Sequence, residues 1–145
     1  MRIFGNRVER NRGKWALWRW HDIELDGEKY LTRLQIFKTP FLSAKLHWIH
    51  RPDPDRDLHD HPWPFMSFVI NGGYTELESK RPATGEVREL EIRNFNYKNT
   101  TTAHRIAYVL PRTLTFILTG PRSKSWGFYD TKTNEFTDWK EYERL

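Results

Sequence analysis

Turn signals recur at short intervals along this chain, and no long segment between them has the 3.6-residue period of an amphipathic helix. Asp-Gly within 25–29 and Asn-Gly-Gly at 71–73 are strong hairpin signals. Short runs rich in β-branched and aromatic residues lie between the turns, a pattern typical of strands. We predict strands near 29–38, 44–51, 65–70, 74–79, 86–92, 104–110, 113–119, 125–130 and 136–139, and a short helix at 139–144.

Eight or more short strands joined by tight turns predict an all-β sandwich or barrel. The length of 145 residues suits one domain, and the aromatic content of 15% is enough to build a core. No repeat, low-complexity tract or linker divides the chain. We therefore predict a single β-barrel domain over residues 20–145, preceded by a basic arm over residues 1–19.

The basic arm carries the charge excess of the whole chain. Residues 1–19 hold six basic side chains against the single acid Glu9, whereas the rest of the chain has 18 residues of each sign, so the net charge of +5 comes from the arm. Such an arm suits a phosphate backbone or an anionic lipid surface, but phosphate affinity needs several placed charges. We favour a solvated start of the chain, with nucleic acid as the less favoured partner.

The composition also removes several classes of protein. The chain has no cysteine, which excludes disulfides, thiolate nucleophiles, iron–sulfur clusters and cysteine zinc sites. No apolar run is long enough to span a membrane, and the N-terminus lacks the apolar core of a secretory signal. We expect a cytoplasmic protein without a membrane partner.

The stretch DRDLHDHPWPF at 55–65 contains the strongest chemical signal. Imidazole is the commonest side-chain metal ligand, and residues i and i+2 of an extended chain point to the same side. His59 and His61 can therefore direct two nitrogens at one point. The alternative is a pair of exposed loop histidines.

A third ligand is needed, and His104 is the best candidate among the other histidines. It opens the predicted strand HRIAYVL after the polar loop NYKNTTTA, so the sheet would hold its ring in place. A strand-end histidine bonded to a neighbour is the plainer alternative.

These residues resemble the cupin family, small jelly-roll barrels with one metal in the barrel mouth. Cupins carry two short motifs, of which the first contains His-x-His and a closing glycine, matched here by His59, His61 and Gly73, and the second contains a histidine, matched by His104 at a similar spacing. The chain departs from both motifs elsewhere. The glutamate of the first falls on Phe65 or Met66 and its leading glycine on Asp53; the proline, glycine and asparagine of the second fall on Asn99, Thr101 and Tyr108.

The resemblance implies a cupin-type jelly-roll β-barrel with a divalent metal ion on His59, His61 and His104. Three-histidine cupins resemble thiol and diketone-cleaving dioxygenases, so Fe(II) and a dioxygenase acting on a small organic substrate are the expected cofactor and activity. Isomerase and lyase chemistry are variants, and Zn, Ni or Mn also accept imidazole. A homodimer is expected by resemblance. The rival hypothesis is a non-enzymatic metal- or small-molecule-binding cupin, a sensor or structural protein, whose basic arm contacts nucleic acid.

Four further residues are candidates for the surroundings of the metal or for a substrate pocket. Asp57 is a fourth ligand or a hydrogen-bond acceptor for a ligating imidazole, although loop solvation is the simpler role. His47 or His50 should face the interior, and His47 is a candidate extra ligand or substrate contact, with a hydrogen-bonded core histidine as the more common alternative. Trp63 can wall a pocket or fill the core, and Tyr108 can donate a hydrogen bond in the site or serve as a buried core tyrosine.

Overall fold

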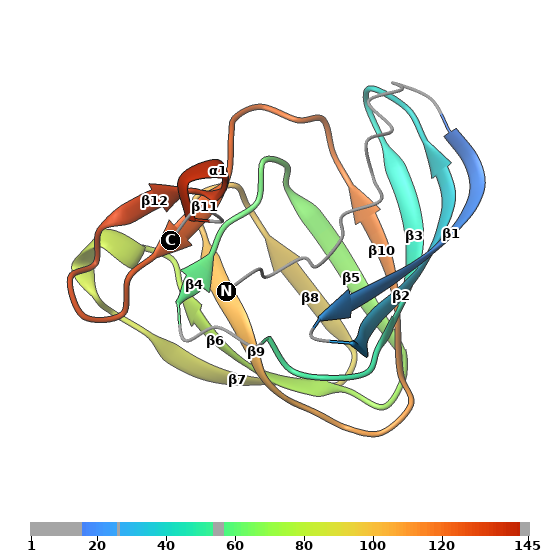
Figure 1. Ribbon diagram of the computed structural model, residues 1–145, viewed down its shortest axis with the longest axis horizontal. Helices are drawn as coiled ribbons and strands as arrows, with labels where there is room; N and C mark the ends of the chain where they lie inside the picture. The colour runs from blue at the N-terminus through green and yellow to red at the C-terminus, as the bar shows by residue number, and fades with distance from the viewer. Residues whose placement is uncertain (1–15, 26, 54–56, 143–145) are drawn as a thin grey trace.

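The computed structural model describes residues 16–25, 27–53 and 57–142, which form two six-stranded antiparallel sheets packed face to face (Figure 1). Sheet A has the order β1(Ala16–Leu25), β2(Glu28–Lys38), β3(Ser43–Ile49), β10(Thr113–Thr119), β5(Phe65–Asn71) and β8(Phe95–Lys98). Sheet B has the order β12(Phe136–Asp138), β11(Gly127–Tyr129), β4(Leu58–His59), β9(Ala103–Val109), β6(Tyr74–Ser79) and β7(Arg88–Ile92). A 3-10 turn, Pro82–Thr84, joins β6 to β7, and a single helical turn α1(Trp139–Tyr142) follows β12.

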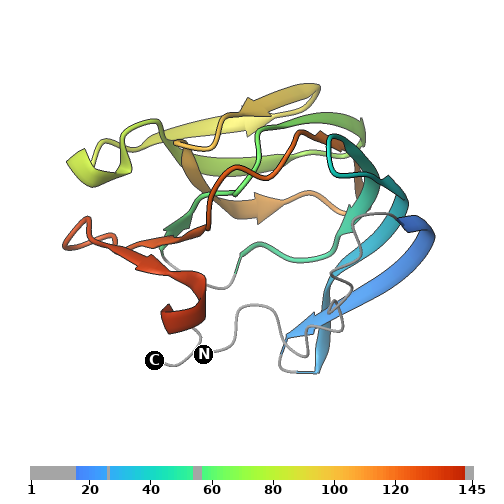
Figure 2. The same ribbon diagram turned by 90° about the horizontal axis from the view of Figure 1, so that it is seen from above.

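The strands from β3 to β10 form a jelly roll. The chain crosses between the sheets at every step except the β6–β7 hairpin, which stays within sheet B. The β1–β2 hairpin extends sheet A beside β3, and the β11–β12 hairpin extends sheet B beside β4. Figure 2 shows these two hairpins projecting on the same side of the molecule. The predicted all-β jelly roll is confirmed, but among the described residues the two sheets do not close into one hydrogen-bonded barrel.

Most predicted strands lie within two residues of the observed ones, and three observed strands were not predicted. Strand β4 has only two residues, too few to show alternation, and β8 has four. Strand β1 begins at Ala16, so residues 16–19 of the predicted basic arm belong to sheet A. Residues 1–15, the remainder of that arm, lie outside the described residues. No helix in the described part of the chain is both long and apolar enough to cross a membrane.

The hydrophobic core is divided into two clusters. One packs Tyr30, Leu31 and Ile49 of sheet A against Tyr74 and Ile92 of sheet B. The other packs Trp126 and Phe128 under Trp139 and Tyr142. Between the two clusters the interior is lined by residues that belong to neither of them, such as Lys45 and Thr115.

Sheet A carries its polar residues inward. Alternation places Lys45 and His47 of β3, and Thr115 and Thr119 of β10, on the face toward sheet B, where they line an internal cavity. The outer face instead carries exposed apolar side chains such as Phe68 and Tyr97. The inner face of sheet A is therefore mixed, since Leu31, Ile49 and Ile117 share it with these polar side chains, whereas the inner faces of an ordinary sandwich are mainly apolar.

Gly73, the closing glycine of the first cupin motif, is required by its surroundings. Its φ is +150°, and a Cβ there would lie 2.6 Å from the carbonyl oxygen of Ile92. Gly27, in the β1–β2 turn, has φ +81° but no atom within 4 Å of the same position. An alanine at Gly27 would therefore add backbone strain alone, whereas an alanine at Gly73 would add strain and a steric collision.

We predict that Gly73→Ala lowers the free energy of unfolding by roughly 3 kcal/mol, because strain and collision add. Gly27→Ala, which adds strain alone, should cost about 1 kcal/mol. Urea denaturation of both variants measures the difference. Equal losses would mean that the β5–β6 turn relaxes around the added methyl group.

Candidate metal centre

His59 and His61 reach the interior because of the way β4 is held. This strand lies between β11 and β9, and His59 pairs with Phe128 on one side and with His104 on the other. Asp60, between the two histidines, is buried; it accepts a hydrogen bond from the Gly127 backbone N–H at 2.9 Å and pairs with Lys124. Adjacent residues of an extended chain point to opposite sides, so these contacts of Asp60 turn both imidazoles inward.

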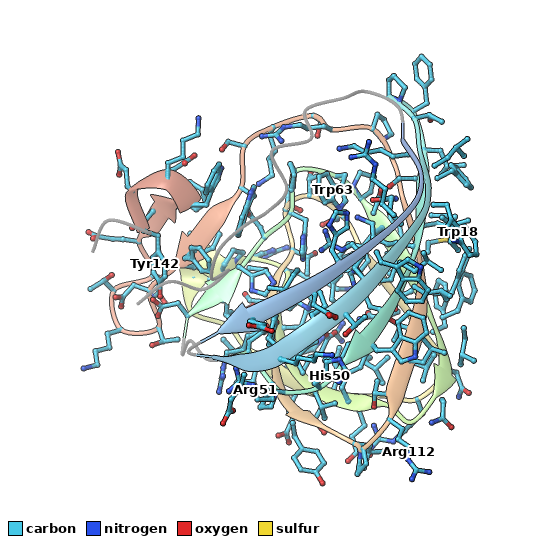
Figure 3. The ribbon with its side chains drawn as sticks, turned by 45° about the vertical axis from the view of Figure 1, so that its right-hand side comes forward. Trp18, His50, Arg51, Trp63, Arg112 and Tyr142 are labelled. Carbon is cyan, nitrogen blue, oxygen red and sulfur yellow. The ribbon has the colours of Figure 1, made fainter. Side chains whose placement is uncertain are left out.

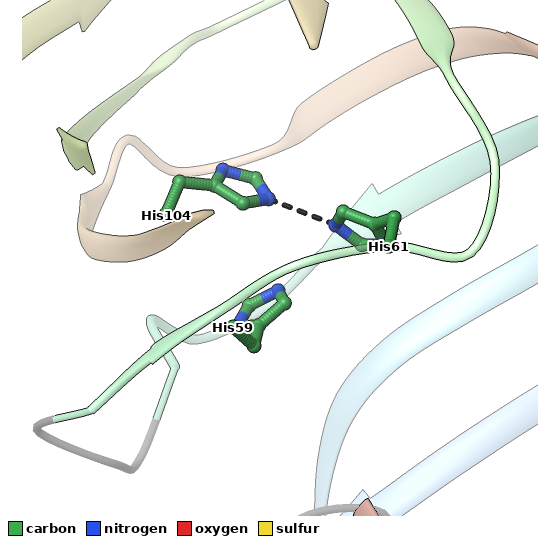
Figure 4. Close-up of side chains that lie close together, drawn as sticks. All are labelled: His59, His61 and His104. Atoms are coloured by element: carbon green, nitrogen blue, oxygen red, sulfur yellow. Dashed lines mark hydrogen bonds between the residues drawn. The ribbon is translucent and has the colours of Figure 1, made fainter. Parts of the chain in front are cut away.

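The three predicted histidines lie together (Figure 4). Each offers one ring nitrogen, and these nitrogens all lie within 4.8 Å of one another. The Nε2 atoms of His61 and His104 are 3.0 Å apart and share a hydrogen bond. Among the described residues no cysteine or carboxylate joins this cluster, so it presents three nitrogen ligands.

Glu76 on β6 fixes the ring of His104. Its Oε2 lies 2.8 Å from His104 Nδ1, and its side chain is fully buried. An ionised carboxylate can only accept, so Nδ1 of His104 donates, and a neutral His104 then has an unprotonated Nε2 facing His61. This carboxylate–imidazole arrangement is the one that typically orients metal-ligating histidines.

Lys98 on β8 supplies the counter-charge for that carboxylate. Its Nζ lies 2.5 Å from Oε1 of Glu76 and also pairs with Glu78, and Lys98 is only 1% exposed. Burial raises the pKa of Glu76, but His104 and Lys98 outweigh it and lower the pKa to about 2. Glu76 is therefore ionised at neutral pH, ready to accept the proton on His104 Nδ1.

The histidines of the interior are held neutral. Burial, partly offset by Asp53, lowers the pKa of His59 to about 4. Burial, with the neighbouring His59, His104 and Lys45 adding to it, lowers the pKa of His61 well below its usual range. Since metals bind the neutral imidazole, neither ring has to lose a charge at neutral pH before it can act as a ligand.

The cluster faces a cavity of about 920 Å³ between the two sheets. This volume is within the range of small-molecule sites. Sheet A contributes Arg33, Lys45, His47 and Thr115, across from the three histidines of sheet B and its following loop. Trp20 of β1 and Trp126, which directly precedes β11, also line the cavity, together with other residues of β1 and α1. The arrangement can hold a metal and an organic ligand at the same time.

Three of the four additional candidates line this cavity: His47, Asp57 and Trp63. His47 faces inward, and its Nε2 accepts a hydrogen bond from Arg33 Nε at 3.0 Å, whereas His50 is exposed at the end of the strand. Trp63, on the loop after His61, lies in the wall, with Lys45 Nζ 5.1 Å from the centre of its ring (Figure 3).

Asp57 holds two segments of the chain together and is not placed as a metal ligand. It lines the cavity, but its carboxylate accepts hydrogen bonds from the Thr131 backbone N–H at 3.2 Å and from the Tyr142 hydroxyl at 3.1 Å. It is not part of the three-nitrogen cluster. Asp57 therefore anchors the C-terminal hairpin and α1 to the start of β4.

Tyr108 does not reach the site, which corrects its prediction as a pocket residue. It is 57% exposed and does not line the cavity. Glu76 pairs with Ile106 but Thr75 pairs with Tyr108, so β9 carries one extra residue, a β-bulge. One extra residue reverses the facing of those that follow, and Tyr108 is turned to the outside.

Sequence reasoning missed Glu76 and Lys98. The sequence signal for Glu76 was its place with Glu78 on one face of a predicted strand, a pattern that also suits a solvated edge. Lys98 lies in β8, which was not predicted at all. Recognising either would have required knowing that β6 lies between β9 and β7, which a single sequence does not show.

Several solved protein structures have a fold similar to that of this chain. HppE in its Fe(II) form matches with a TM-score of 0.54 at 13% identity, over 71% of this chain and 55% of that one. KdgF from Halomonas sp. matches with a TM-score of 0.53 at 21% identity, over 74% of this chain and 95% of that one. An RmlC-like cupin from Shewanella frigidimarina matches with a TM-score of 0.51 at 15% identity, over 75% and 95%.

The sequence itself matches no protein-family model and no curated protein. This chain spans only about half the length of HppE, whereas it matches nearly the whole of the KdgF and RmlC-like chains. At these identities the likeness shows a shared fold and no shared activity.

We predict that Glu76→Gln weakens metal binding roughly 10–100-fold, because glutamine cannot act as the charged acceptor for His104 Nδ1–H. Glu78→Gln is the matched control, since Glu78 lies opposite His104 across β6 and β9 and also pairs with Lys98, but the carboxylate bonded to His104 Nδ1 is that of Glu76. Competition titration with a metal-binding dye measures both affinities. A comparable loss in the two variants would assign the effect to the charge on Lys98 rather than to His104.

The neutral histidines also predict a pH dependence. The unfolded chain takes up protons at the ordinary imidazole pKa near 6.5, whereas folded His59 takes one up only near pH 4. The contribution to stability is complete above the unfolded pKa and is lost as pH falls toward the folded one. Urea unfolding of the metal-free protein should show a loss of about 2 kcal/mol from His59 alone between pH 7 and pH 5.

The pKa of His47 is also lowered well below its usual range, first by burial and then by Arg33 and Lys45, so His47→Gln should make this pH slope shallower. A stability that stays flat from pH 7 to pH 5 would contradict the assignment of neutral histidines.

Proposed function

We propose that this chain, which has the cupin fold, binds one divalent metal ion through His59, His61 and His104 and acts on a small organic molecule. The observation that carries the proposal is the convergence of three imidazole nitrogens within 4.8 Å at the wall of a large cavity. Three imidazoles, brought together from two strands and a loop, are a common way for a protein to leave metal positions open for a substrate.

The donor set fits a first-row divalent metal. Neutral imidazole suits Fe, Zn, Ni and Cu. The buried Glu76 accepts a hydrogen bond from Nδ1 of His104, as a carboxylate next to a metal-ligating histidine commonly does. We propose Fe(II) and an oxygen-dependent oxidation, an oxygenase or dioxygenase reaction. The metal would supply the activation of oxygen and an anchor for a chelating substrate.

The chain's own residues prepare the site for that chemistry. Glu76 holds the proton of His104 on Nδ1 and so keeps Nε2 directed at the cluster. Phe65 and Trp126 border the histidine rings on the cavity side, which limits water around them. Lys45 and Arg33 face the centre from sheet A and can hold a substrate against it.

One structural neighbour supports this choice by what its name states. HppE is described with Fe(II) and a substrate, and related structures name it hydroxypropylphosphonic acid epoxidase. The Bacillus subtilis oxalate decarboxylase shows that the fold also hosts decarboxylation. Because one fold hosts many activities, the reaction of this chain must be established by measurement.

Elemental analysis of untagged protein tests the metal site. We expect about one equivalent of iron in the native protein or after anaerobic Fe(II) addition, lost in His59→Ala and His104→Ala. His50→Ala, at an exposed histidine outside the cavity, is the control and should retain the metal. Protein that binds no divalent metal under either condition would overturn the proposal, and one equivalent of zinc with no oxygen uptake would replace oxidation by Lewis-acid chemistry.

A homodimer is a separate proposal. Phe68 and Ile70 of β5, with Phe95 and Tyr97 of β8, leave apolar side chains exposed on the outer face of sheet A, and β8 is the edge strand there. Among the described strands none pairs with the outer edge of β8, and an exposed apolar face that ends in such an edge suits a second copy. Light scattering should give twice the chain mass, and Phe95→Glu should shift it to the monomer; a monomeric native protein would contradict the proposal.

A further inference from the structure

The inner face of sheet A brings three hydrogen-bonding side chains together on the cavity wall. His47 of β3 pairs with Thr115 of β10, and Gln35 of β2 pairs with Lys45, two residues along β3 from His47. Residues two apart on a strand point to the same side, so Gln35, His47 and Thr115 share the inner face. His47 is directly opposite one of them and diagonal to the other, within about 8 Å of each. All three line the cavity.

Thr115 provides the first evidence for a ligand here. Its side chain is 0% exposed, and its Oγ1 has no hydrogen-bond partner in the described part of the chain. The other threonines on this face of β10 do have partners: Thr113 donates to the Leu110 carbonyl at 2.7 Å, and Thr119 bonds to Ser43. A buried hydroxyl without a partner costs free energy, so such a group usually marks the place of a ligand or an ordered water.

His47 offers a hydrogen-bond donor. Its Nε2 lies 3.0 Å from Nε of Arg33, and a guanidinium can only donate, so Nε2 is the acceptor and carries no proton. The imidazole ring keeps at least one proton, which is then on Nδ1. Among the described residues none accepts a hydrogen bond from this nitrogen.

Gln35 offers a hydrogen-bond acceptor. Its amide reaches the carbonyl oxygens of Phe37 at 2.8 Å and Ala44 at 3.1 Å. Carbonyl oxygens can only accept, so the amide atom that faces them is Nε2, and both of its N–H groups are used. Within the part of the chain that the structure describes, nothing donates to Oε1 of this buried side chain.

The three groups together favour a ligand that both donates and accepts. A carboxylate or ketone oxygen could bind the Nδ1–H of His47 but would leave Oε1 of Gln35 without a donor. An ammonium group could bind Gln35 but would leave the donor of His47 without an acceptor. A hydroxyl group can do both, and the Thr115 hydroxyl can take either role beside it.

We propose that Gln35, His47 and Thr115 form a subsite for the hydroxyl groups of a small organic alcohol or polyol. The statement that this alcohol is the substrate, with another part of the molecule at the histidine cluster, rests on the proposed function. The subsite itself does not, because none of its three residues belongs to that cluster.

Ligand-observed NMR titration tests the subsite in metal-free and in Zn(II)-loaded protein. Two sets of probes share a carbon skeleton: cyclohexanol, cyclohexanone and cyclohexylamine, and isopropanol, acetone and isopropylamine. A third set is glucose with its monodeoxy analogues. At least one alcohol should bind about 10-fold more tightly than its ketone, amine or deoxy counterpart, since each counterpart leaves a buried polar group unpaired. Equal affinities in all three sets would overturn the proposal.

Thr115→Val removes the hydroxyl without changing the shape of the side chain. It should weaken the preferred alcohol about 10-fold and leave the counterparts unchanged, while the melting temperature of the unliganded protein does not fall. Thr119→Val is the matched control, because Thr119 is buried on the same strand and lines the cavity, but its hydroxyl is bonded to Ser43. The control should keep the preference for the alcohol.

Two substitutions of His47 test the donor. His47→Gln can keep an acceptor for Arg33 but has no donor at the position of Nδ1, so it should lose the preference for the alcohol. His47→Asn places an amide N–H near that position and should retain the preference. The same affinity for the alcohol in both variants would overturn the role of His47.

The outcomes separate this inference from the proposed function. A preference for the alcohol that is lost in Thr115→Val but kept in Thr119→Val supports the subsite, even if the native protein binds no metal. Metal binding without such a preference overturns the subsite and leaves the metal proposal in place. A preference that survives Thr115→Val also overturns it, since the hydroxyl would then serve an ordered water.

Discussion

The cross-strand pair of His59 and His104 is the contact on which the rest of the site depends. Strand β4 has two residues and is ordered by its neighbours rather than by its own length. The link from Asp60 to Gly127 on one side and the pairing with β9 on the other fix which way its side chains point. Two imidazoles from a short strand and its loop thereby meet a third from the sheet.

Behind this pair, a charge network that joins the two sheets determines the chemical state of the ligands. Glu76 accepts from His104 and is itself neutralised by Lys98, whose side chain is almost fully buried. Burial raises the pKa of Glu76, and its contacts with His104 and then Lys98 lower it further than burial raises it, so the carboxylate stays ionised. The network therefore sets the tautomer of His104 before any metal arrives.

The sequence was sufficient for the fold class and for the three histidines, because turn residues, strand alternation and the His-x-His spacing are local signals. It was insufficient where the outcome depends on neighbours across a sheet. Glu76 becomes a partner of His104 only because β6 lies beside β9, and Tyr108 leaves the site only because a bulge in β9 reverses its facing. The inward polar residues of sheet A were likewise hidden, since their position around one cavity depends on β2, β3 and β10 being adjacent, which a single sequence does not show.

The two clusters of the hydrophobic core form part of the cavity wall. Leu31 and Phe128, which hold the sheets together, line the same space as Lys45 and Thr115. A substitution of an apolar wall residue therefore changes the packing of the molecule and the shape of the cavity together, whereas Lys45 and Thr115 belong to neither cluster.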